Sequence, residues 1–333
     1  MRKLFLLFLL FLQGCEDKKI EVKTNILTIY TYDTFASDWG AGPKIKDAFE
    51  KENNCTLNFV GVSSSIGALR KIQLEGKTTK ADILLGLDTA VAEVAKDTNL
   101  FDFHSLKLKN LTLPISYKDN YFIPFDYSYF AFVYDSDKLK NPPSSFEELA
   151  NMPKDFKIVL QDPRSSTPGL GLLLWVKEVY ANNSNEFWKE LTPHILSITK
   201  GWSEAYGLFL KGEADMVLSY TTSPAYHMVE DNKTNYKAAN FKEGHYAQIE
   251  VAGMLKSSKH KPLAKKFLAF LMSEKFANII PTTNWAYPVI KSNDLPKVFD
   301  SLEVPKKVYI WSGKQVELKR KDIIDEWLKA VAK

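Results

Sequence analysis

Cysteine is almost absent from this chain of 333 residues, which contains only Cys15 and Cys55. Cys15 falls in a predicted export signal, so a mature chain has no second thiol with which Cys55 could form an intramolecular disulfide. Histidine is also scarce: there are five, and none follows the spacing of an H-E-x-x-H zinc motif. These absences exclude a disulfide-stabilised framework and give no support to a zinc hydrolase.

An excess of charge of one sign is missing as well. The 44 basic and 40 acidic residues give a net charge of +4, without a basic stripe, and we expect no nucleic-acid partner. Neither a G-x-S-x-G elbow nor a glycine-rich dinucleotide fingerprint occurs. Glu75-Gly-Lys-Thr78 resembles the end of a phosphate loop, but Lys71 stands where that loop requires glycine. We therefore predict neither a nucleotide site nor any cofactor.

Long apolar runs are missing too. The longest, Leu4–Leu12, has nine residues, whereas a helix that spans a bilayer needs about 20. It follows Met1-Arg-Lys and leads into Leu12-Gln-Gly-Cys15, which is the pattern of a lipoprotein signal peptide. We expect residues 1–15 to be this signal with Cys15 as the lipidation site, and residues 16–25 to be a tether. The protein would then be exported and held by a lipid anchor in the periplasm or at the outer face of the cytoplasmic membrane; an ordinary cleaved signal is the alternative.

The remaining chain repeats a strand, a polar loop and a helix. The first strand, 26–30, is followed by a loop with Tyr32 and Trp39, and later strands are predicted at 57–62 and 81–85. This alternation predicts an α/β fold with a largely parallel sheet and its loops gathered along one edge.

Two longer apolar stretches, 123–134 and 246–254, are predicted to cross between two lobes. Lobe one would consist of residues 26–124 and 252–333, and lobe two of residues 125–251.

The stretch 201–227 carries the densest set of candidate binding residues. It predicts a helix capped by Ser203, a buried strand at 216–219, and a second helix opened by Ser223-Pro224. In open α/β sheets, ligands bind beyond the carboxyl ends of strands and at the start of the helices that follow. The candidates at this strand end are Tyr220, Thr221, Thr222, Ser223, Pro224 and Tyr226.

Several long segments resemble the thiamine-binding proteins of bacterial ABC transporters. They are LTIYTYDTFASDWGAGPKIKDAFE (27–50), ADILLGLD (81–88), PFDYSYFAFVYD (124–135), QDPRSSTPGLGLLLW (161–175) and GWSEAYGLFLKGEADMVLSYTTSPAYH (201–227). The resemblance extends over residues 26 to 290. It implies a type II periplasmic-binding-protein fold, in which two α/β lobes are joined by crossing strands. It also implies a protein that delivers thiamine to an ABC permease and its ATPase, and we expect a monomer. The predicted helix start at Thr167-Pro168, with free N–H groups beside the hydroxyls of Ser165, Ser166 and Thr167, predicts that thiamine monophosphate and thiamine diphosphate bind as well; capping of the helix is the alternative role of these hydroxyls.

The resemblance also implies a ligand site made of rings and hydroxyl groups. Thiamine is a flat aminopyrimidine joined to a cationic thiazolium, and aromatic faces attract flat cations by about 0.5 to 2 kcal/mol per ring. For each single ring, burial in the core is the alternative role. The rings are Tyr32, Trp39, Trp202, Tyr220, Tyr226 and Trp285, and the hydroxyl-bearing positions outside 220–226 are Ser64, Ser65, Ser166 and Thr167.

One position departs from the family. The loop after the second strand often carries an acidic residue and a glycine in these proteins, whereas Ser64-Ser65 stands here. A hydroxyl group accepts a hydrogen bond from an amine but adds no charge. Asp88 either supplies the missing negative charge or caps the helix that follows it.

Two other functions stay open at this stage. Thiaminase I resembles these binding proteins but attacks thiamine with a cysteine, for which Cys55 is the single candidate. A binding protein for another solute, such as iron or a spermidine-like polyamine, is the second alternative. An iron site would require a cluster of tyrosine, histidine and carboxylate ligands.

Overall fold

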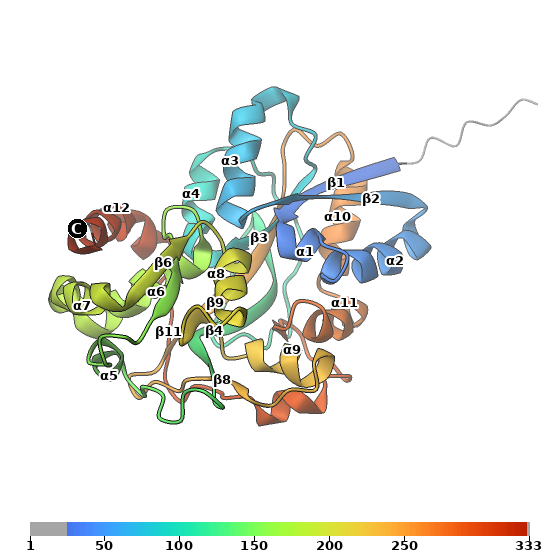
Figure 1. Cartoon of the computed structure of the whole chain (residues 1–333). Helices are drawn as coiled ribbons and strands as arrows, with labels where there is room; N and C mark the ends of the chain where they lie inside the picture. Colours follow the sequence, from blue (N-terminus) through green and yellow to red (C-terminus); the bar gives the residue numbers. More distant parts are fainter. Residues whose placement is uncertain (1–24, 332–333) are drawn as a thin grey trace, which may run out of the picture.

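The computed structural model describes residues 25–331, and a sheet of 11 strands runs through them (Figure 1). The predicted signal peptide, Cys15 and all of the predicted tether except Asn25 lie outside the described residues. The main strand order is β2-β1-β3-β9-β4-β7-β5-β6; β8 and β10 pair with β4, and β11 pairs with β9. The strands are β1 Asn25–Tyr32, β2 Cys55–Val62, β3 Ile83–Asp88, β4 Phe122–Asp135, β5 Ile158–Gln161, β6 Ile195–Thr199, β7 Met216–Tyr220, β8 Tyr236–Ala238, β9 His245–Met254, β10 Tyr287–Pro288 and β11 Val308–Tyr309.

Strand direction changes at the middle of this sheet. In the first strand group, β1 is parallel to β2 and β3; in the second strand group, β5 is parallel to β6 and β7. Between the groups lie β9 and β4, which are antiparallel to each other and to their neighbours β3 and β7. The predicted parallel pairing is therefore confirmed within each group, and the two predicted crossing stretches are the central strands β4 and β9.

The registers bring the carboxyl ends of both strand groups to the middle of β4. Asp88, the last residue of β3, pairs with Glu250, which in turn pairs with Asp126 of β4. Tyr220, the last residue of β7, pairs with Phe130 farther along the same strand. Since ligands bind beyond the carboxyl ends of strands in open α/β sheets, this convergence places a candidate cleft over the centre of β4 and β9.

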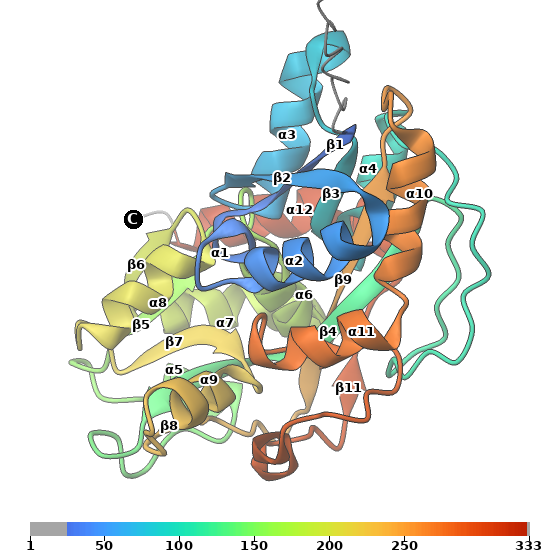
Figure 2. The same ribbon diagram turned by 90° about the vertical axis from the view of Figure 1, so that its right-hand side faces the viewer.

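Helices cover the sheet at both ends. In Figure 2, α2, α10 and α11 lie together beside the first strand group, where Phe49 meets Phe267 edge to face at 5.2 Å. Beside the second group, Trp175 of α6 meets Phe146 of α5 at 4.6 Å. No helix within residues 25–331 is long and apolar enough to cross a membrane. The α-helices are α1 Asp33–Ala36, α2 Ala41–Asn53, α3 Ser65–Glu75, α4 Ala92–Asp97, α5 Phe146–Ala150, α6 Thr167–Tyr180, α7 Ser184–Leu191, α8 Trp202–Leu210, α9 Ser223–Glu230, α10 Lys261–Phe270, α11 Glu274–Ile279 and α12 Gly313–Val331.

The last helix, α12, packs against elements near both strand groups. It contacts α6 and α7 on one side, and α4 with the 3-10 helix η2 (Thr89–Val91) on the other. Val316, Ile323 and Trp327 are buried in this junction. The chain segment predicted to complete lobe one therefore ends in a helix that also packs on the predicted lobe two.

The start of α8 differs from the prediction. Sequence analysis places the cap at Ser203, whereas the helix begins at Trp202 and its N-cap is Gly201. A Cβ atom on Gly201 would lie 2.6 Å from the carbonyl oxygen of Ser63, which precedes α3. This close approach explains why the cap position carries no side chain, and Ser203 faces the cleft instead.

Candidate functional site

A cavity of about 380 Å³ opens over the middle of β4 and β9. Its volume lies in the usual range of small-molecule sites, about 300 to 1,000 Å³. Twelve of the 14 predicted ligand contacts line it: Tyr32, Trp39, Ser64, Ser65, Ser166, Thr167, Trp202, Tyr220, Thr222, Ser223, Tyr226 and Trp285. Thr221 and Pro224 do not line it. Thr221 is buried at the end of β7 and its backbone N–H donates to the carbonyl oxygen of Tyr129, while Pro224 is buried in the first turn of α9.

None of the six predicted rings is a fully buried core side chain. Trp39 is 63% exposed at the cavity, and the other five are half-buried. Trp202 stacks on Tyr206 with centroids 4.6 Å apart, and Tyr226 meets Trp285 edge to face at 5.6 Å. The backbone of Trp285 has a φ of 54°, a left-handed conformation that is rare for bulky residues and is found preferentially at functional sites. These six rings form what we call the aromatic walls.

Hydrogen bonds fix the wall contributed by the stretch 201–227. The Trp202 indole N–H donates to Ser219 Oγ at 2.8 Å. Tyr206, which supports the Trp202 ring, shares a hydrogen bond with His227 Nε2 at 2.9 Å, and His227 Nδ1 lies 2.8 Å from Asp231. Burial lowers the pKa of His227, which favours the neutral imidazole. These hydrogen bonds therefore hold the stacked rings of Trp202 and Tyr206 at a defined position beside the cavity.

The start of α6 brings two hydroxyl groups to the cavity. Ser166 is the N-cap and Thr167 the first helical residue; both are buried, and Ser166 makes no capping hydrogen bond with its side chain. A Cβ atom on Gly169 would lie 2.3 Å from the carbonyl oxygen of Gln161, so glycine allows the helix to begin directly against the end of β5. This packing sets the amino end of α6 at the cavity.

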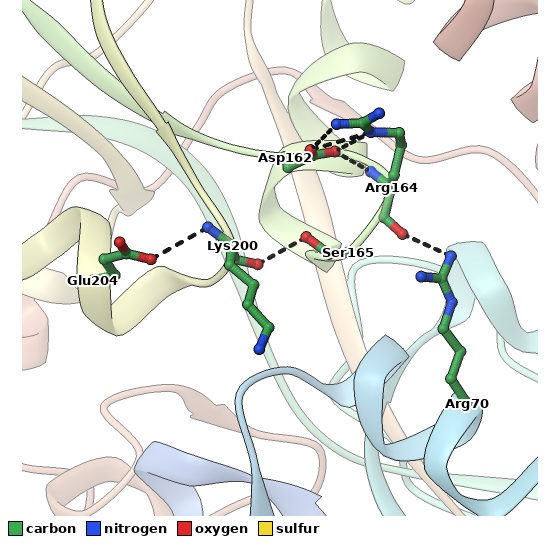
Figure 3. Close-up of polar contacts among 6 residues, drawn as sticks. All are labelled: Arg70, Asp162, Arg164, Ser165, Lys200 and Glu204. Carbon is green, nitrogen blue, oxygen red and sulfur yellow. Dashed lines mark hydrogen bonds and ion pairs between the residues drawn. The ribbon is translucent and has the colours of Figure 1, made fainter. Parts of the chain in front are cut away.

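The charged residues beside this helix end make contacts elsewhere (Figure 3). Arg164 pairs with Asp162, with Nη2 2.5 Å from Oδ2, and its carbonyl oxygen accepts from Arg70 at 3.1 Å. Ser165 Oγ donates to the carbonyl oxygen of Lys200 at 2.9 Å. None of these five residues lines the cavity. Of the hydroxyl and basic groups in this loop, only Ser166 and Thr167 are presented to a ligand.

Ser64 and Asp88 both act as helix caps. Ser64 Oγ accepts from the backbone N–H of Gly67 at 3.0 Å at the start of α3, and it also lines the cavity. Asp88 accepts from the backbone N–H of Ala90 in η2 and does not line the cavity. Of the two roles considered for Asp88, the structure shows the cap. The negative charge of the cavity comes from other residues.

Two carboxyl groups that the sequence pattern did not predict lie on the floor of the cavity. Asp126 of β4 and Glu250 of β9 lie opposite each other in register, and both line the cavity. Asn284 Nδ2 donates to Asp126 at 2.6 Å, and the Tyr32 hydroxyl donates to Glu250 at 2.8 Å. Burial raises the pKa of Asp126 to about 7, and burial together with the charge of Asp126 raises the pKa of Glu250 well above its ordinary value. We call Asp126 and Glu250 the floor pair.

A signal for the floor pair was present in the sequence. Both carboxyl groups interrupt strands that are otherwise apolar and aromatic, and Gln248 does the same in β9. Burying an ionisable group in such a strand is costly unless it has partners. A carboxylate inside a predicted crossing strand therefore indicates a binding role, which the periodicity of the strand alone does not reveal.

The charge around the cavity is entirely acidic. Asp33, Asp126 and Glu250 line it, whereas no lysine, arginine or histidine of the described chain does. Residues 25–331 also hold no group of three or more histidine, cysteine or carboxylate residues arranged for a metal ion. A cavity with aromatic walls and an acidic floor suits an organic cation.

Cys55 lies away from this cavity. It is the first residue of β2, is half-buried, and does not line the cavity. Burial, with a contribution from Glu50, raises the pKa of its thiol. Since the thiolate is the nucleophile in cysteine chemistry, this position offers no counterpart of a thiaminase nucleophile.

Comparison with known proteins identifies close relatives. The model of the family of bacterial extracellular solute-binding proteins matches residues 40–277. The thiamine-binding periplasmic protein of Salmonella typhimurium is 50% identical over 92% of this chain and 94% of its own length, and that of Haemophilus influenzae is 43% identical over 92% of each. A solved periplasmic thiamin binding protein superimposes with a TM-score of 0.91 at 48% identity, covering 93% of this chain and 97% of that one.

Proposed function

The chain belongs to the bacterial extracellular solute-binding protein family, and we propose that it captures thiamine between two lobes and delivers it to the permease of an ABC importer. The observation that carries this proposal is the pairing of aromatic walls with an acidic floor in one cavity that no basic residue among 25–331 lines. Relatives that share about half of the residues are thiamine-binding periplasmic proteins. The function is binding and delivery, not chemical conversion.

Each part of thiamine has a suitable partner in this cavity. The positive thiazolium is attracted by ring faces such as Trp202 and by the floor pair. The exocyclic amine of the pyrimidine can donate to hydroxyl groups such as Ser64. A neutral ligand would gain nothing from the carboxyl groups and would leave them desolvated, so the cavity discriminates in favour of a cation.

Phosphate esters of thiamine fit the same proposal. A phosphate group placed at the amino end of α6 would meet the unpaired backbone N–H groups of the first turn and the hydroxyls of Ser166 and Thr167. These groups need no lysine or arginine to bind an anion, and Arg164 is already paired with Asp162. We propose that thiamine monophosphate and thiamine diphosphate bind with an affinity similar to that of thiamine.

Titration of the purified protein with thiamine tests the main proposal. We expect saturable heat on calorimetry and quenching of tryptophan fluorescence at micromolar ligand, because three tryptophans line the cavity. Spermidine and ferric iron serve as competitors for the two alternative solutes, and chromatography of the ligand after incubation detects any cleavage. Absence of a saturable signal with thiamine would refute the assignment.

We further propose that the protein is exported, monomeric and anchored to the membrane through a lipid on Cys15, which lies outside the described residues. The sequence Leu12-Gln-Gly-Cys15 after an apolar run supports this part. Cys15→Ser should release the protein from the membrane fraction into the soluble fraction. Unchanged fractionation of the variant would exclude lipidation at this residue, without affecting the proposal of thiamine binding.

A further inference from the structure

The floor pair has a geometry that the capture of a cation does not by itself require. Asp126 and Glu250 are paired neighbours across the β4–β9 ladder, and both line the cavity. One amide group, Asn284 Nδ2, donates to both: at 2.6 Å to Asp126 and at 3.3 Å to Glu250. Two carboxylates this close and this buried repel each other, so a proton held between them stabilises the empty cavity.

The groups that face the floor pair from other elements supply no positive charge. Tyr32 on β1 and Tyr220 on β7 are phenols whose pKa burial raises well above the ordinary value, so they stay protonated as donors. Asp88 on β3 lies beside Glu250 in the ladder, and burial raises its pKa to about 7. Asp33 on α1 is a further carboxylate, exposed at the cavity, and α6 contributes only hydroxyl groups.

We propose that the floor pair holds one proton while the cavity is empty and releases it to solvent when an organic cation binds, so that ligand capture is coupled to pH. The exchange is balanced in charge: the cation enters, one proton leaves, and the carboxyl group that held it becomes a carboxylate beside the ligand. Within the described part of the chain, no basic side chain lines the cavity that could neutralise the pair. The coupling rests on the proposed function only for the identity of the cation, thiamine.

The expected pH dependence follows from linkage. Below the pKa of the empty pair, binding must displace a proton, so each unit of acidification weakens the affinity about tenfold. Above that pKa the pair is already ionised, and the affinity becomes independent of pH. Since burial raises the pKa of Asp126 to about 7 and that of Glu250 well above its ordinary value, the affinity should fall on acidification below neutral pH.

Isothermal titration calorimetry measures the proton directly. Thiamine is titrated into the full-length protein near neutral pH in two buffers with different ionisation enthalpies, and the difference in heat gives the number of protons released. We expect about one proton for the wild type and clearly fewer for Asp126→Asn and for Glu250→Gln, because each variant removes one of the two carboxyl groups between which the proton is held. Asp33→Asn is the matched control: it removes a cavity carboxylate outside the pair and should leave the proton count unchanged.

The possible results of this experiment separate the pH coupling from the proposed function. Saturable thiamine binding without proton release, and without weaker binding at acidic pH, overturns the coupling and leaves the proposed function intact. If the wild type and both floor variants release the same number of protons, the proton comes from the ligand or from Asp88, and this result also overturns the coupling. No thiamine binding at all would refute the proposed function itself. If a variant fails to fold, the wild-type proton count and the pH dependence of its Kd still decide the question.

Discussion

The floor and the walls of the cavity are built from different parts of the fold and do different work. The floor pair sits within β4 and β9, where each backbone is fixed by hydrogen-bonded neighbours on both sides. The aromatic walls come from strand ends, loops and helices: Tyr32 and Tyr220 are the last residues of β1 and β7, and Trp39 lies in the loop before α2 and is largely exposed. The floor therefore lies in the central strands of the sheet and carries ionisable groups, whereas the walls come from several separate segments and are neutral.

This difference suggests a division of labour in recognition. Ring faces supply contact area and a modest attraction for any flat cation, at about 0.5 to 2 kcal/mol each. Buried carboxylates contribute more to discrimination between ligands of different charge. They are costly to leave unpaired, and only a positively charged ligand removes that cost. We therefore expect the floor to decide whether a ligand carries the correct charge, and the walls to decide whether it has the correct shape.

The largest effect should follow from removing charge at the floor. Asp126→Asn combined with Glu250→Gln should weaken thiamine binding by about 2 to 4 kcal/mol, or roughly 30- to 1,000-fold, because the cation loses its buried counter-charge. Calorimetry gives the Kd. An affinity loss no larger than that of a single wall variant would show that the floor is not the dominant contributor.

The same variants should change the stability of the ligand-free protein in the opposite sense. A carboxyl whose pKa is raised from its ordinary range to about 7 on folding binds its proton more tightly in the native state, so stability falls as pH rises from about 4 to about 7. Thermal melts of the wild type should show this decline between acidic and neutral pH. Asp126→Asn should make the melting temperature less dependent on pH and higher near neutral pH. An unchanged dependence of the melting temperature on pH would contradict the conclusion that burying the ionised pair destabilises the ligand-free protein.

Wall variants should have a smaller effect that leaves the fold intact. Trp202→Ala and Tyr226→Ala should each weaken thiamine binding by about tenfold, since each removes one ring face from a half-buried position. Leu173→Ala in α6 is a matched control for core loss, because Leu173 is buried and does not line the cavity. The control should lower the melting temperature strongly, while the wall variants should lower it little; the reverse result would make these rings structural.

Much of the fold was predictable because it follows from local pattern. The long apolar stretches predicted to cross are β4 and β9, and the strand end at Tyr220 lines the cavity as expected. The floor pair was not predicted, because which residues of β4 and β9 meet depends on register between segments more than 100 positions apart. Gly201 was assigned no role for the same reason, since its neighbour Ser63 is distant in sequence.

The close approach at Gly201 brings the start of α8 against the loop before α3, and both segments border the cavity. Gly201→Ala places a Cβ atom 2.6 Å from the carbonyl oxygen of Ser63, so the two sides of the cavity must separate slightly. We expect a loss of thiamine affinity of about fivefold, close to 1 kcal/mol, with little change in the stability of the ligand-free protein. Gly207→Ala is the comparison variant: Gly207 also lines the cavity, but no atom lies within 4 Å of its added Cβ, so it adds a methyl group to α8 without the clash. Equal affinities for the two variants would show that this contact does not govern the cavity.

The smallest effect on thiamine itself is expected at the amino end of α6, where a double variant separates the phosphate esters from thiamine. Ser166→Ala with Thr167→Ala removes two hydroxyl groups but keeps the backbone N–H groups of the helix, so part of the anion site survives. We expect the double variant to weaken binding of thiamine monophosphate and diphosphate about threefold to tenfold, and to leave thiamine almost unaffected, in line with about 1 kcal/mol for a lost hydrogen bond. Ser165→Ala is the control, since that hydroxyl donates to the carbonyl oxygen of Lys200 and does not line the cavity. Dissociation constants for the three ligands decide the point: an equal loss for all three would mean that these hydroxyls support the cavity in general, because a true anion site penalises only the esters.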